Sequence, residues 1–445
     1  MIVMKFGGGT LATRERMERC IALVEADTDR RPVVVVSAHG KTTDGLLEAA
    51  GRALAGAHES AILDEVRALH LGLAAAYGVE ATVLELLEQL EALLQGVALL
   101  RELTPRTLDR VLSFGERLSS TIFAAGLRAR GLPGVAVTAY DAGMVTDSNF
   151  GGAAPLPEAE GRLREGIGRI DGLPVVTGFL GKNPQGEITT LGRSGSDFTA
   201  TYVAAAIGAE EVVVWKDVDG VMTADPGLDD RALNIPELSF DEASELAYFG
   251  AEVLHPATLL PAIHKKIPVR VVNAFKAEEP GTVVLSHPVH SGRIAKSVVY
   301  KEDVTLLHLI SPRLHSVPHV LGAALNVLEE EGIIAHMIAT SEAGISLITQ
   351  SGLSGERRDT ALRRLGALAA VECLPSMAII CLVGEELRGC ADPVGRVFDS
   401  LAAAGINGKV ITRSASEINL AFLVEEAEIG PAVRSLHSLI VEGAR

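Results

Sequence analysis

The last third of the chain repeats itself at one constant offset, and this feature constrains the fold more than any other. Seven residues of the first copy recur as identical residues 73 positions later, which chance does not readily produce. Each copy reads as a strand, a helix, two strands and a second helix, judged from the spacing of its apolar residues. The chain therefore carries two copies of one small structural unit. The repeated residues are Gly322, Leu328, Gly332, Ile333, Ile338, Ser341 and Ile345, which recur as Gly395, Leu401, Gly405, Ile406, Ile411, Ser414 and Ile418.

Units of the βαββαβ kind bury one face of an antiparallel sheet under two helices. We expect the first unit over residues 303–372 and the second over residues 376–445. Neither unit has an acid-base cluster of its own, and paired units of this size resemble the ACT fold, which binds small effectors. The resemblance implies a regulatory region, and a module that only joins two subunits is the alternative.

Residues 1–292 alternate strands and helices in the manner of α/β proteins. Apolar runs such as IVMKF, VVVV, PVVTGF, VVVWK and IPVRVV are separated by helical stretches, which predicts a mainly parallel sheet sandwiched by helices. From about Ala57 to Leu112 the chain is rich in Leu, Glu and Ala at helical spacing, so we expect a helical insertion there. His, Pro, Gly and Ser then gather in LSHPVHSGR, where we place the main domain boundary.

The composition argues against macromolecular partners other than copies of the chain. The 445 residues carry a formal net charge of −17 and a pI near 5.2, so the field of the molecule repels nucleic acid and anionic membranes. The apolar runs are too short to span a bilayer and no export signal is recognisable, so we expect a cytoplasmic protein that acts on small metabolites. The cysteines form no CxxC pair and lie near no histidine at zinc-ligand spacing, so we expect free thiols and no protein-built metal site. They are Cys20, Cys373, Cys381 and Cys390.

The strongest chemical signal is KFGGGT at residues 5–10, where an apolar strand ends in three glycines before a helix. Glycine lets backbone N–H groups converge on phosphate oxygens, and the N-terminus of a helix adds its positive end. Lys5 is the only charge in this strand, so it would lie where the phosphates gather. The pattern predicts a phosphate-binding turn at Gly7, Gly8 and Gly9.

Two other nucleotide-binding motifs compete for this region. Gly7, Gly9 and Ala12 satisfy the G-x-G-x-x-A fingerprint of dinucleotide-binding folds, but the second strand ends in Ser37 where that fingerprint requires an acidic residue. A P-loop at residues 40–42 would need glycine at position 35, where the chain has valine. We therefore favour a phosphate site of another kind.

Eight segments of the chain carry a family resemblance through both their sequence and their order. They are KFGGGT, VVVSAHGKTTDGLL, SFGERLSS, VTGFLG, TTLGRSGSDFTA, VVWKDVDGVMTADP, ELAYFGAEVLHP and IPVRVVN. In this order they resemble the aspartate kinase family, and most closely its monofunctional, plant-like members. The resemblance covers essentially the whole chain and implies an amino acid kinase fold followed by two ACT units. It also implies that ATP with Mg²⁺ phosphorylates the side-chain carboxylate of L-aspartate to 4-phospho-L-aspartate, the first step toward lysine, threonine and methionine.

The same resemblance assigns roles to individual residues. Phosphoryl transfer needs positioned cations and clamps more than covalent chemistry from the protein. An amino-acid substrate needs a guanidinium fork for its carboxylate and an acceptor for its ammonium. The implied catalytic residues are Lys5 and Asp197; the implied substrate residues are Ser37, Thr43, Glu116, Arg193 and Ser196; the implied nucleotide residues are Lys5, Gly7, Gly8, Gly9, Lys216, Asp217 and Asp225.

The chain departs from the commoner bacterial pattern near the nucleotide. Met222 stands where many members have Tyr, Gly227 where many have Arg, and Glu252 where many have Lys. Plant-like members share these absences and carry Lys at the position of Lys216, which can restore part of the positive charge. In the first glycine run, Gly9-Thr10 replaces the Thr/Ser-Ser pair that the family usually has. The chain therefore keeps a hydroxyl there, shifted by one residue.

Two alternative functions stay open. One is an effector-sensing relative without catalytic activity, and the other is a kinase for another small amino acid, such as glutamate or an N-acetylated one. Glu116 argues against an acylated substrate, because acylation removes the ammonium that Glu116 would hold. Since Arg445 follows soon after the second repeat, we expect one reaction and no fused homoserine dehydrogenase.

The resemblance also implies an amino-acid effector, lysine first and threonine second, bound at an ACT interface of a homodimer or a dimer of dimers. Two histidines are unusual there, because His319 stands where relatives usually have Gly and His336 where they usually have Asp. A cationic histidine would repel a ligand ammonium, and a neutral one is a weaker partner than a carboxylate. The implied effector residues are Leu314, Ser316, His319, His336, Ser341 and Glu342.

Overall fold

The computed structural model describes residues 1–56, 61–251, 254–288, 290–310, 317–342, 344–350, 355–389 and 392–442. The chain forms two compact units that do not follow one another simply along the sequence. The first unit holds Met1–Val221, Pro236–Phe240 and Val253–His287. The second holds Met222–Ile235, Asp241–Glu252 and Pro288–Arg445. Two segments that the sequence placed in the predicted catalytic domain therefore pack in the second unit.

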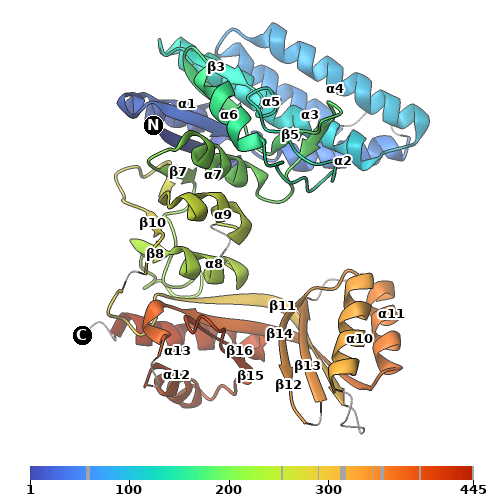
Figure 1. Ribbon diagram of the computed structural model, residues 1–445, viewed down its shortest axis with the longest axis vertical. Helices are drawn as coiled ribbons and strands as arrows, with labels where there is room; N and C mark the ends of the chain where they lie inside the picture. Colours follow the sequence, from blue (N-terminus) through green and yellow to red (C-terminus); the bar gives the residue numbers. More distant parts are fainter. Residues whose placement is uncertain are drawn as a thin grey trace. The chain divides into compact units, whose positions relative to one another are not determined.

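The first unit is built on an eight-stranded sheet with the order β3-β4-β2-β1-β7-β9-β10-β8 (Figure 1). All neighbouring strands are parallel except β9 and β10, which are antiparallel. The predicted mainly parallel sheet is thus confirmed. Its strands are β1 (Ile2–Phe6), β2 (Pro32–Val36), β3 (Gly134–Val137), β4 (Leu173–Thr177), β7 (Val212–Lys216), β8 (Glu237–Ser239), β9 (Val269–Asn273) and β10 (Thr282–Leu285).

Helices cover this sheet, and the predicted helical insertion lies between β2 and β3. Its long helix α5 begins where Thr104 accepts a hydrogen bond from the N–H of Thr107 and Pro105 occupies the first turn, a standard N-terminal cap. The short strands β5 (Leu180–Lys182) and β6 (Ile188–Thr190) form a separate hairpin. The helices are α1 (Arg14–Ala26), α2 (Thr42–Leu54), α3 (Ala61–Ala75), α4 (Glu80–Leu100), α5 (Pro105–Ala129), α6 (Ala159–Gly168), α7 (Gly195–Ile207) and α9 (Pro256–Lys265).

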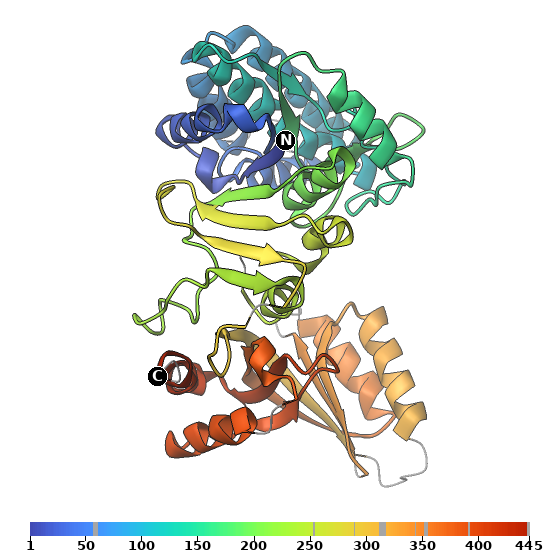
Figure 2. The same ribbon diagram turned by 60° about the vertical axis from the view of Figure 1, so that its left-hand side comes forward.

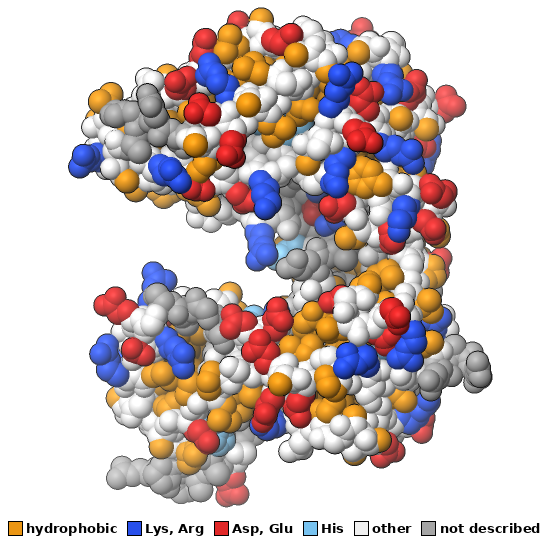
Figure 3. Space-filling model, turned by 180° about the vertical axis from the view of Figure 1, so that it is seen from behind, with side chains coloured by type: hydrophobic (Ala, Val, Ile, Leu, Met, Phe, Trp, Pro, Cys, Tyr) orange, Lys and Arg blue, Asp and Glu red, His pale blue; other side chains and the backbone are white. Residues whose placement is uncertain are grey.

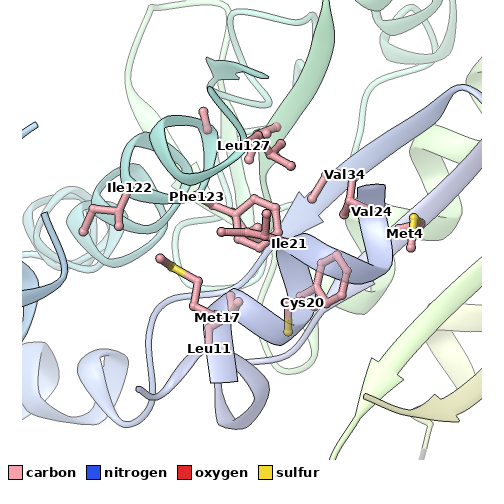
Figure 4. Packing of buried hydrophobic residues seen from close by; sticks show 14 of the residues in the cluster. Met4, Leu11, Met17, Cys20, Ile21, Val24, Val34, Ile122, Phe123 and Leu127 are labelled. Atoms are coloured by element: carbon pink, nitrogen blue, oxygen red, sulfur yellow. The ribbon is translucent and has the colours of Figure 1, made fainter. Parts of the chain in front are cut away.

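The core of the first unit lies between β1, α1 and α5 (Figure 4). Ile21 of α1 lies against Phe123 of α5, and Cys20 and Val24 belong to the same buried cluster. Phe6 stacks on Phe123 with ring centroids 5.4 Å apart and on Trp215 at 6.3 Å. Because burying one large apolar side chain stabilises by about 1.5–3 kcal/mol, this packing fixes the end of β1, next to the predicted phosphate turn.

The second unit contains one six-stranded antiparallel sheet with the order β12-β13-β11-β14-β16-β15. Helices α10 and α11 lie side by side on the half that belongs to the first repeat (Figures 1 and 2), while α12 and α13 pack on the other half. The elements are α8 (Phe240–Tyr248), β11 (Ser297–Ile310), α10 (Val317–Glu330), β12 (Ala335–Thr340), β13 (Gly344–Gln350), α11 (Gly355–Gly366), β14 (Ala370–Val383), α12 (Asp392–Ala403), β15 (Lys409–Thr412), β16 (Asn419–Glu425) and α13 (Ile429–Glu442).

The two repeats share the long strands β11 and β14. The later part of β11, from Val304, pairs with β13 and belongs to the first repeat. Its first residues, Ser297–Lys301, pair instead with Ile379–Val383 of β14, which is the first strand of the second repeat. The sequence left residues 293–302 between the predicted domains, yet they supply the fourth strand of the second repeat.

The segment Met222–Ile235 is held in the second unit by buried polar contacts. Thr223 Oγ1 lies 2.8 Å from His437 Nε2, and His437 Nδ1 lies 2.9 Å from Asp229 Oδ2. Arg231 also pairs with Asp229 at 2.7 Å. Because His437 lies on α13, these contacts attach the segment to the last helix of the second repeat.

On the face drawn in Figure 3, acidic and basic side chains of the first unit are interspersed, so its charge is not gathered in one patch there. Within the described residues, no helix is both long and apolar enough to cross a membrane.

Candidate active site

The predicted site residues of the first unit gather where parallel strands end. The glycine run follows β1, Ser37 follows β2, Gly178 follows β4, and Lys216 ends β7. These strands are neighbours in the sheet and point the same way, so their carboxyl ends meet at one edge. Ligands of open parallel sheets bind at this edge.

Two loops at this edge approach each other too closely for a side chain. The N–H of Gly40 donates to the carbonyl of Gly8 at 2.9 Å, and the N–H of Ser37 donates to that of Phe6 at 3.1 Å. A Cβ on Gly8 would lie 2.8 Å from the carbonyl oxygen of Ala38, which no real side chain tolerates. Position 8 therefore has room only for glycine, and the backbone of the turn stays accessible.

The helix that the sequence predicted after the glycine run begins at Arg14. A short 3-10 helix, Gly9–Leu11, precedes it, and Thr13 caps α1 by accepting a hydrogen bond from the N–H of Arg16. Thr10 is buried, and its hydroxyl donates to the carbonyl of Gly7 at 2.8 Å. The hydroxyl of Thr10 thus holds the turn.

Lys5, Asp197 and Lys216 form a buried charge cluster beside the turn. Lys5 Nζ lies 2.6 Å from Asp197 Oδ1, and Lys216 Nζ lies 3.7 Å from Asp197 Oδ2. The three residues come from the end of β1, the first turn of α7 and the end of β7. A Cβ on Gly7 would lie 3.6 Å from Lys5 Nζ, so this ammonium lies next to the phosphate turn.

The two lysines keep the carboxyl of Asp197 ionised. Burial alone would raise the pKa of Asp197, but the two lysines outweigh it and lower that pKa below the usual value. Burial lowers the pKa of Lys216, and Asp197 offsets part of that effect. An ionised Asp197 can therefore orient both lysines, since a buried charge is tolerated only with such partners.

Glu116 of α5 is a second buried carboxylate at the same edge. Its Oε1 accepts a hydrogen bond from the N–H of Ala38 at 3.2 Å, whereas Oε2 has no hydrogen-bond partner among the described residues. Burial raises the pKa of Glu116 to about 8. The neighbouring Gly115 allows this approach, because a Cβ there would lie 2.8 Å from that of Ala38. Glu116 thus offers one unused acceptor to a ligand.

Arg193 lies exposed in a tight turn before α7. Gly192 and Ser194 flank it with φ values of 76° and 58°, both in the left-handed region. Ser196 is buried, and a Cβ on Gly178 would lie 2.5 Å from its Cβ, so α7 packs directly on the end of β4. Ser37 and Thr43 are half-buried on the loop and helix that follow β2.

The two remaining predicted nucleotide residues, Asp217 and Asp225, belong to different units. Asp217 is exposed at the end of β7, and a Cβ on Gly9 would lie 2.9 Å from its Oδ2. Asp225 belongs to the second unit, where its carboxylate accepts hydrogen bonds from the N–H of Gly227 at 2.7 Å and the hydroxyl of Tyr300 at 2.9 Å. Glu252 lies outside the described residues.

The predicted effector residues are only partly described, since Leu314 and Ser316 lie outside the described residues. His336 is half-buried and meets Tyr248 edge-on with ring centroids 6.2 Å apart. Burial, with Lys301 nearby, lowers the pKa of His336 to about 4, so this histidine is neutral near pH 7. His319 and Glu342 are exposed, and Ser341 accepts a hydrogen bond from the N–H of Gly344.

Two buried polar groups near the site escaped the sequence analysis. His39 is fully buried, and neither of its ring nitrogens has a hydrogen-bond partner among the described residues. It meets His70 of the helical insertion edge-on, with ring centroids 5.3 Å apart. Asp109 of α5 is buried seven residues before Glu116. A charged residue on the buried stripe of a helix was the available signal for Asp109.

Comparison with known proteins agrees with this geometry. The model of the amino acid kinase family matches residues 1–273, and an ACT domain model matches residues 380–439. Aspartokinase 1, chloroplastic, from Arabidopsis thaliana is 39% identical over 99% of this chain and 80% of its own length. Lysine-sensitive aspartokinase 3 from Escherichia coli is 32% identical over 99% of both chains. This chain belongs to the aspartokinase family.

Solved structures of aspartokinases support the same assignment. E. coli aspartokinase III in complex with aspartate and ADP superposes with a TM-score of 0.82 at 30% identity, covering 99% of this chain and all of that one. The same enzyme in complex with lysine and aspartate gives a TM-score of 0.82 at 32% identity, covering 99% of both chains. The resemblance to plant-like aspartokinases and the predicted kinase fold with ACT units are thereby confirmed.

Proposed function

We propose that this protein is an aspartate kinase, which transfers the γ-phosphoryl group of ATP to the side-chain carboxylate of L-aspartate and forms 4-phospho-L-aspartate. The observation that carries the proposal is the buried cluster in which Asp197 orients Lys5 and Lys216 beside the glycine turn. Fixed cations at such a place suit the charge that spreads over a transferring phosphoryl group. The product is the activated acid from which lysine, threonine and methionine synthesis begins.

In the proposed reaction Lys5 stabilises the transition state. Its ammonium lies next to Gly7 and is fixed by Asp197, so little reorganisation is needed when negative charge develops. Gly7, Gly8 and Gly9 would offer their backbone to the phosphates, with Lys216 as a second cation. Mg²⁺ bound with the nucleotide would neutralise further phosphate charge, and Asp217, exposed beside Gly9, is an oxygen donor of the kind this ion prefers.

The substrate would be held at both ends. The Arg193 guanidinium has no hydrogen bond or ion pair to the described residues, and it would take a carboxylate of aspartate. Glu116 would accept the ammonium with its unused Oε2, and Ser37, Thr43 and Ser196 would add hydroxyl contacts. An N-acetylated substrate has no ammonium for Glu116, and a buried carboxylate left without a partner is costly. This argument favours a free amino acid.

The activity is tested by aspartate-dependent release of ADP, with the acyl phosphate trapped as aspartyl hydroxamate. No ADP release with aspartate would overturn the proposal, and faster turnover of glutamate would redirect it to the other substrate.

Binding measurements separate the two sets of contacts. Arg193→Ala and Glu116→Ala should each weaken aspartate by at least about tenfold and ATP little, because one charged hydrogen bond is lost at the substrate. Lys216→Met should weaken ATP by about tenfold and leave aspartate nearly unchanged. Titration calorimetry that found the two sets interchanged would refute these roles. Asp225 stays a predicted nucleotide contact that the same titration can test.

Regulation by an amino acid is the second part of the proposal. The E. coli relative is named lysine-sensitive, and its structure was solved with lysine, so lysine is the first candidate and threonine the second. Because His336 is neutral, we expect its contribution to inhibition to be constant between pH 6 and 8. Inhibition assays with lysine, threonine and S-adenosylmethionine test this. If none inhibits, the ACT pair serves assembly alone.

Assembly, location and boundaries complete the proposal. We expect a homodimer or a dimer of dimers joined through the ACT units, which light scattering measures. The predicted boundaries, 1–292, 303–372 and 376–445, stay predictions, as do the predicted effector residues Leu314, Ser316, His319, His336, Ser341 and Glu342. A cytoplasmic location also stays a proposal, and the plant relatives are named chloroplastic.

A further inference from the structure

Asp109 is a buried carboxylate whose contacts all lead toward the turn that carries Arg193. Its Oδ2 accepts hydrogen bonds from the N–H of Thr190 at 2.8 Å and from the N–H of Gly151 at 3.0 Å. Its Oδ1 accepts the hydroxyl of Thr190 at 2.9 Å. Three donors from two separate segments therefore converge on one side chain of α5.

Both of these segments adjoin the turn before α7. Thr190 ends β6 and precedes Gly192 by two residues. Gly151 lies against the other side of the turn, because a Cβ on Gly192 would be 3.3 Å from its carbonyl oxygen. The carbonyl of Thr190 also accepts the N–H of Ala153 at 2.9 Å, which joins the two segments to each other. Asp109 thus fixes the backbone that precedes Gly192 in the sequence, at Thr190, and the segment that packs against Gly192, at Gly151.

Arg193 cannot fix this turn by its own side chain. It is exposed, and its guanidinium makes no hydrogen bond or ion pair with the described residues. Its neighbours Gly192 and Ser194 both have left-handed φ values, which are held in place only by their surroundings. The position of the Arg193 backbone therefore depends on the segments that Asp109 ties down.

The same helix carries Glu116. Asp109 and Glu116 are seven residues apart, about two helical turns, so they share one face of α5. Both are buried, and Glu116 contacts the loop after β2 while Asp109 contacts the hairpin that leads to Arg193. Helix α5 thus connects both ends of the proposed substrate site.

We propose that Asp109 is a positioning residue that sets the place of Arg193 relative to Glu116 and so determines the affinity for the substrate carboxylate. The inference rests on the proposed function, because it takes Arg193 and Glu116 as the two substrate clamps. Burial raises the pKa of Asp109. Among the described residues only these three hydrogen-bond donors hold its carboxylate, so their loss acts directly on the turn.

The test compares Asp109→Asn, Thr190→Val and Thr190→Ser with the wild-type protein. Asp109→Asn removes the negative charge that strengthens all three hydrogen bonds and leaves one oxygen acceptor, so we expect aspartate affinity to fall about tenfold. Thr190→Val removes only the hydroxyl and should lower aspartate affinity about threefold. Thr190→Ser keeps the hydroxyl and should restore the aspartate affinity to that of the wild type. ATP affinity should stay within about twofold throughout. Calorimetry gives both affinities without relying on turnover, and steady-state kinetics gives KM and kcat separately.

Arg106→Ala is the matched control. Arg106 lies on the same helix and pairs with Glu187 of the segment between β5 and β6 at 2.8 Å, with the side chain of Arg106 62% exposed and that of Glu187 32% exposed. Losing this pair should change neither affinity, since exposed pairs contribute little. It therefore separates a general loosening of the helix and hairpin from loss of the Asp109 contacts.

The outcomes distinguish the inference from the proposed function. If Arg193→Ala weakens aspartate while Asp109→Asn and Thr190→Val lower only the melting temperature, Asp109 is structural and the inference is overturned. Equal losses of ATP and aspartate affinity would overturn it as well. If Arg193→Ala itself has no effect on aspartate, the proposed substrate site and the inference are both overturned. Selective loss of aspartate affinity with rescue by Thr190→Ser supports it.

Discussion

The two units each bury a lysine against a carboxylate, and they do so in different ways. In the first unit, Lys5 and Lys216 share Asp197, and the cluster adjoins Gly7, in the turn that continues to the exposed Gly9. In the second unit, Lys296 pairs with Glu242 at 2.8 Å, with side chains only 2% and 0% exposed. The second oxygen of Glu242 accepts the N–H of Glu385 at 3.0 Å. One cluster lies at an accessible edge, and the other is closed.

This difference separates a site from a structural contact. A shared carboxylate next to an open turn can orient cations for a ligand that arrives later. A closed pair has no room for a ligand, and it contributes mainly by attaching α8 and the chain before β11 to the second repeat. Replacing Lys5 in the first unit should therefore lower activity, whereas replacing Lys296 in the second unit should lower stability.

The largest effect is expected for Lys296→Met. This change removes the cation from a fully buried carboxylate, and breaking such an ion pair costs about 3–5 kcal/mol of unfolding free energy. Denaturant unfolding measures the loss, and kcat per folded molecule should stay near that of the wild type. Lys276→Met is the control, because Lys276 and Asp219 form an exposed pair at 2.6 Å, and its loss should shift the melting temperature little. Comparable losses in both variants would contradict the distinction.

Lys5→Met should have the next largest effect, and on activity. Removing one preorganised cation at a phosphoryl-transfer site should lower kcat and kcat/KM together by at least about 10²-fold. Asp197 keeps a partner in Lys216, so the melting temperature should change less than in Lys296→Met. Steady-state kinetics with a near-normal kcat would remove Lys5 from the mechanism.

The smallest effect is a dependence of aspartate affinity on pH. Burial raises the pKa of Glu116 to about 8, so in the free enzyme this carboxyl is protonated and neutral at pH 6 and ionises as the pH rises. An ionised Glu116 is the form that accepts an ammonium, and aspartate affinity should therefore rise by up to about tenfold per pH unit below pH 8. Glu116→Gln should remove this slope as well as lower the affinity. A wild-type affinity that stays flat between pH 6 and 8 would count against the role of Glu116.

The sequence predicted the parallel sheet and the glycine turn because both depend on local pattern. Strand β1 and the glycines Gly7, Gly8 and Gly9 can be recognised within the first ten residues of the sequence. The partnership of Lys5 with Asp197 is not local, and only the family resemblance put the two in one site. His39 was missed because its burial depends on other elements, which no local pattern reports. For Asp109 the local pattern could have shown a charge on the buried stripe of a helix, but not the partners that it binds on other elements.

The sequence also missed how the second unit is assembled. The charges Lys301, Glu302 and Asp303 suggest the end of a linker, yet β11 continues through them with a shift of register and a left-handed φ of 57° at Asp303. Such an irregularity bends a strand without ending it. Likewise Thr223 reads as part of a loop after a strand, and its partner His437 lies 214 residues away.

The shared strand has a consequence for how the chain is made. Ser297–Lys301 leaves the ribosome about 80 residues before Ile379–Val383, its partner in β14, so the second repeat cannot close until the first has been synthesised. Contacts between residues so far apart in sequence also slow folding. A fragment cut at residue 303 would contain the whole first repeat but would lack one strand of the second. Expression of the regulatory repeats on their own should therefore begin before Ser297, and the two repeats cannot be exchanged between relatives one at a time.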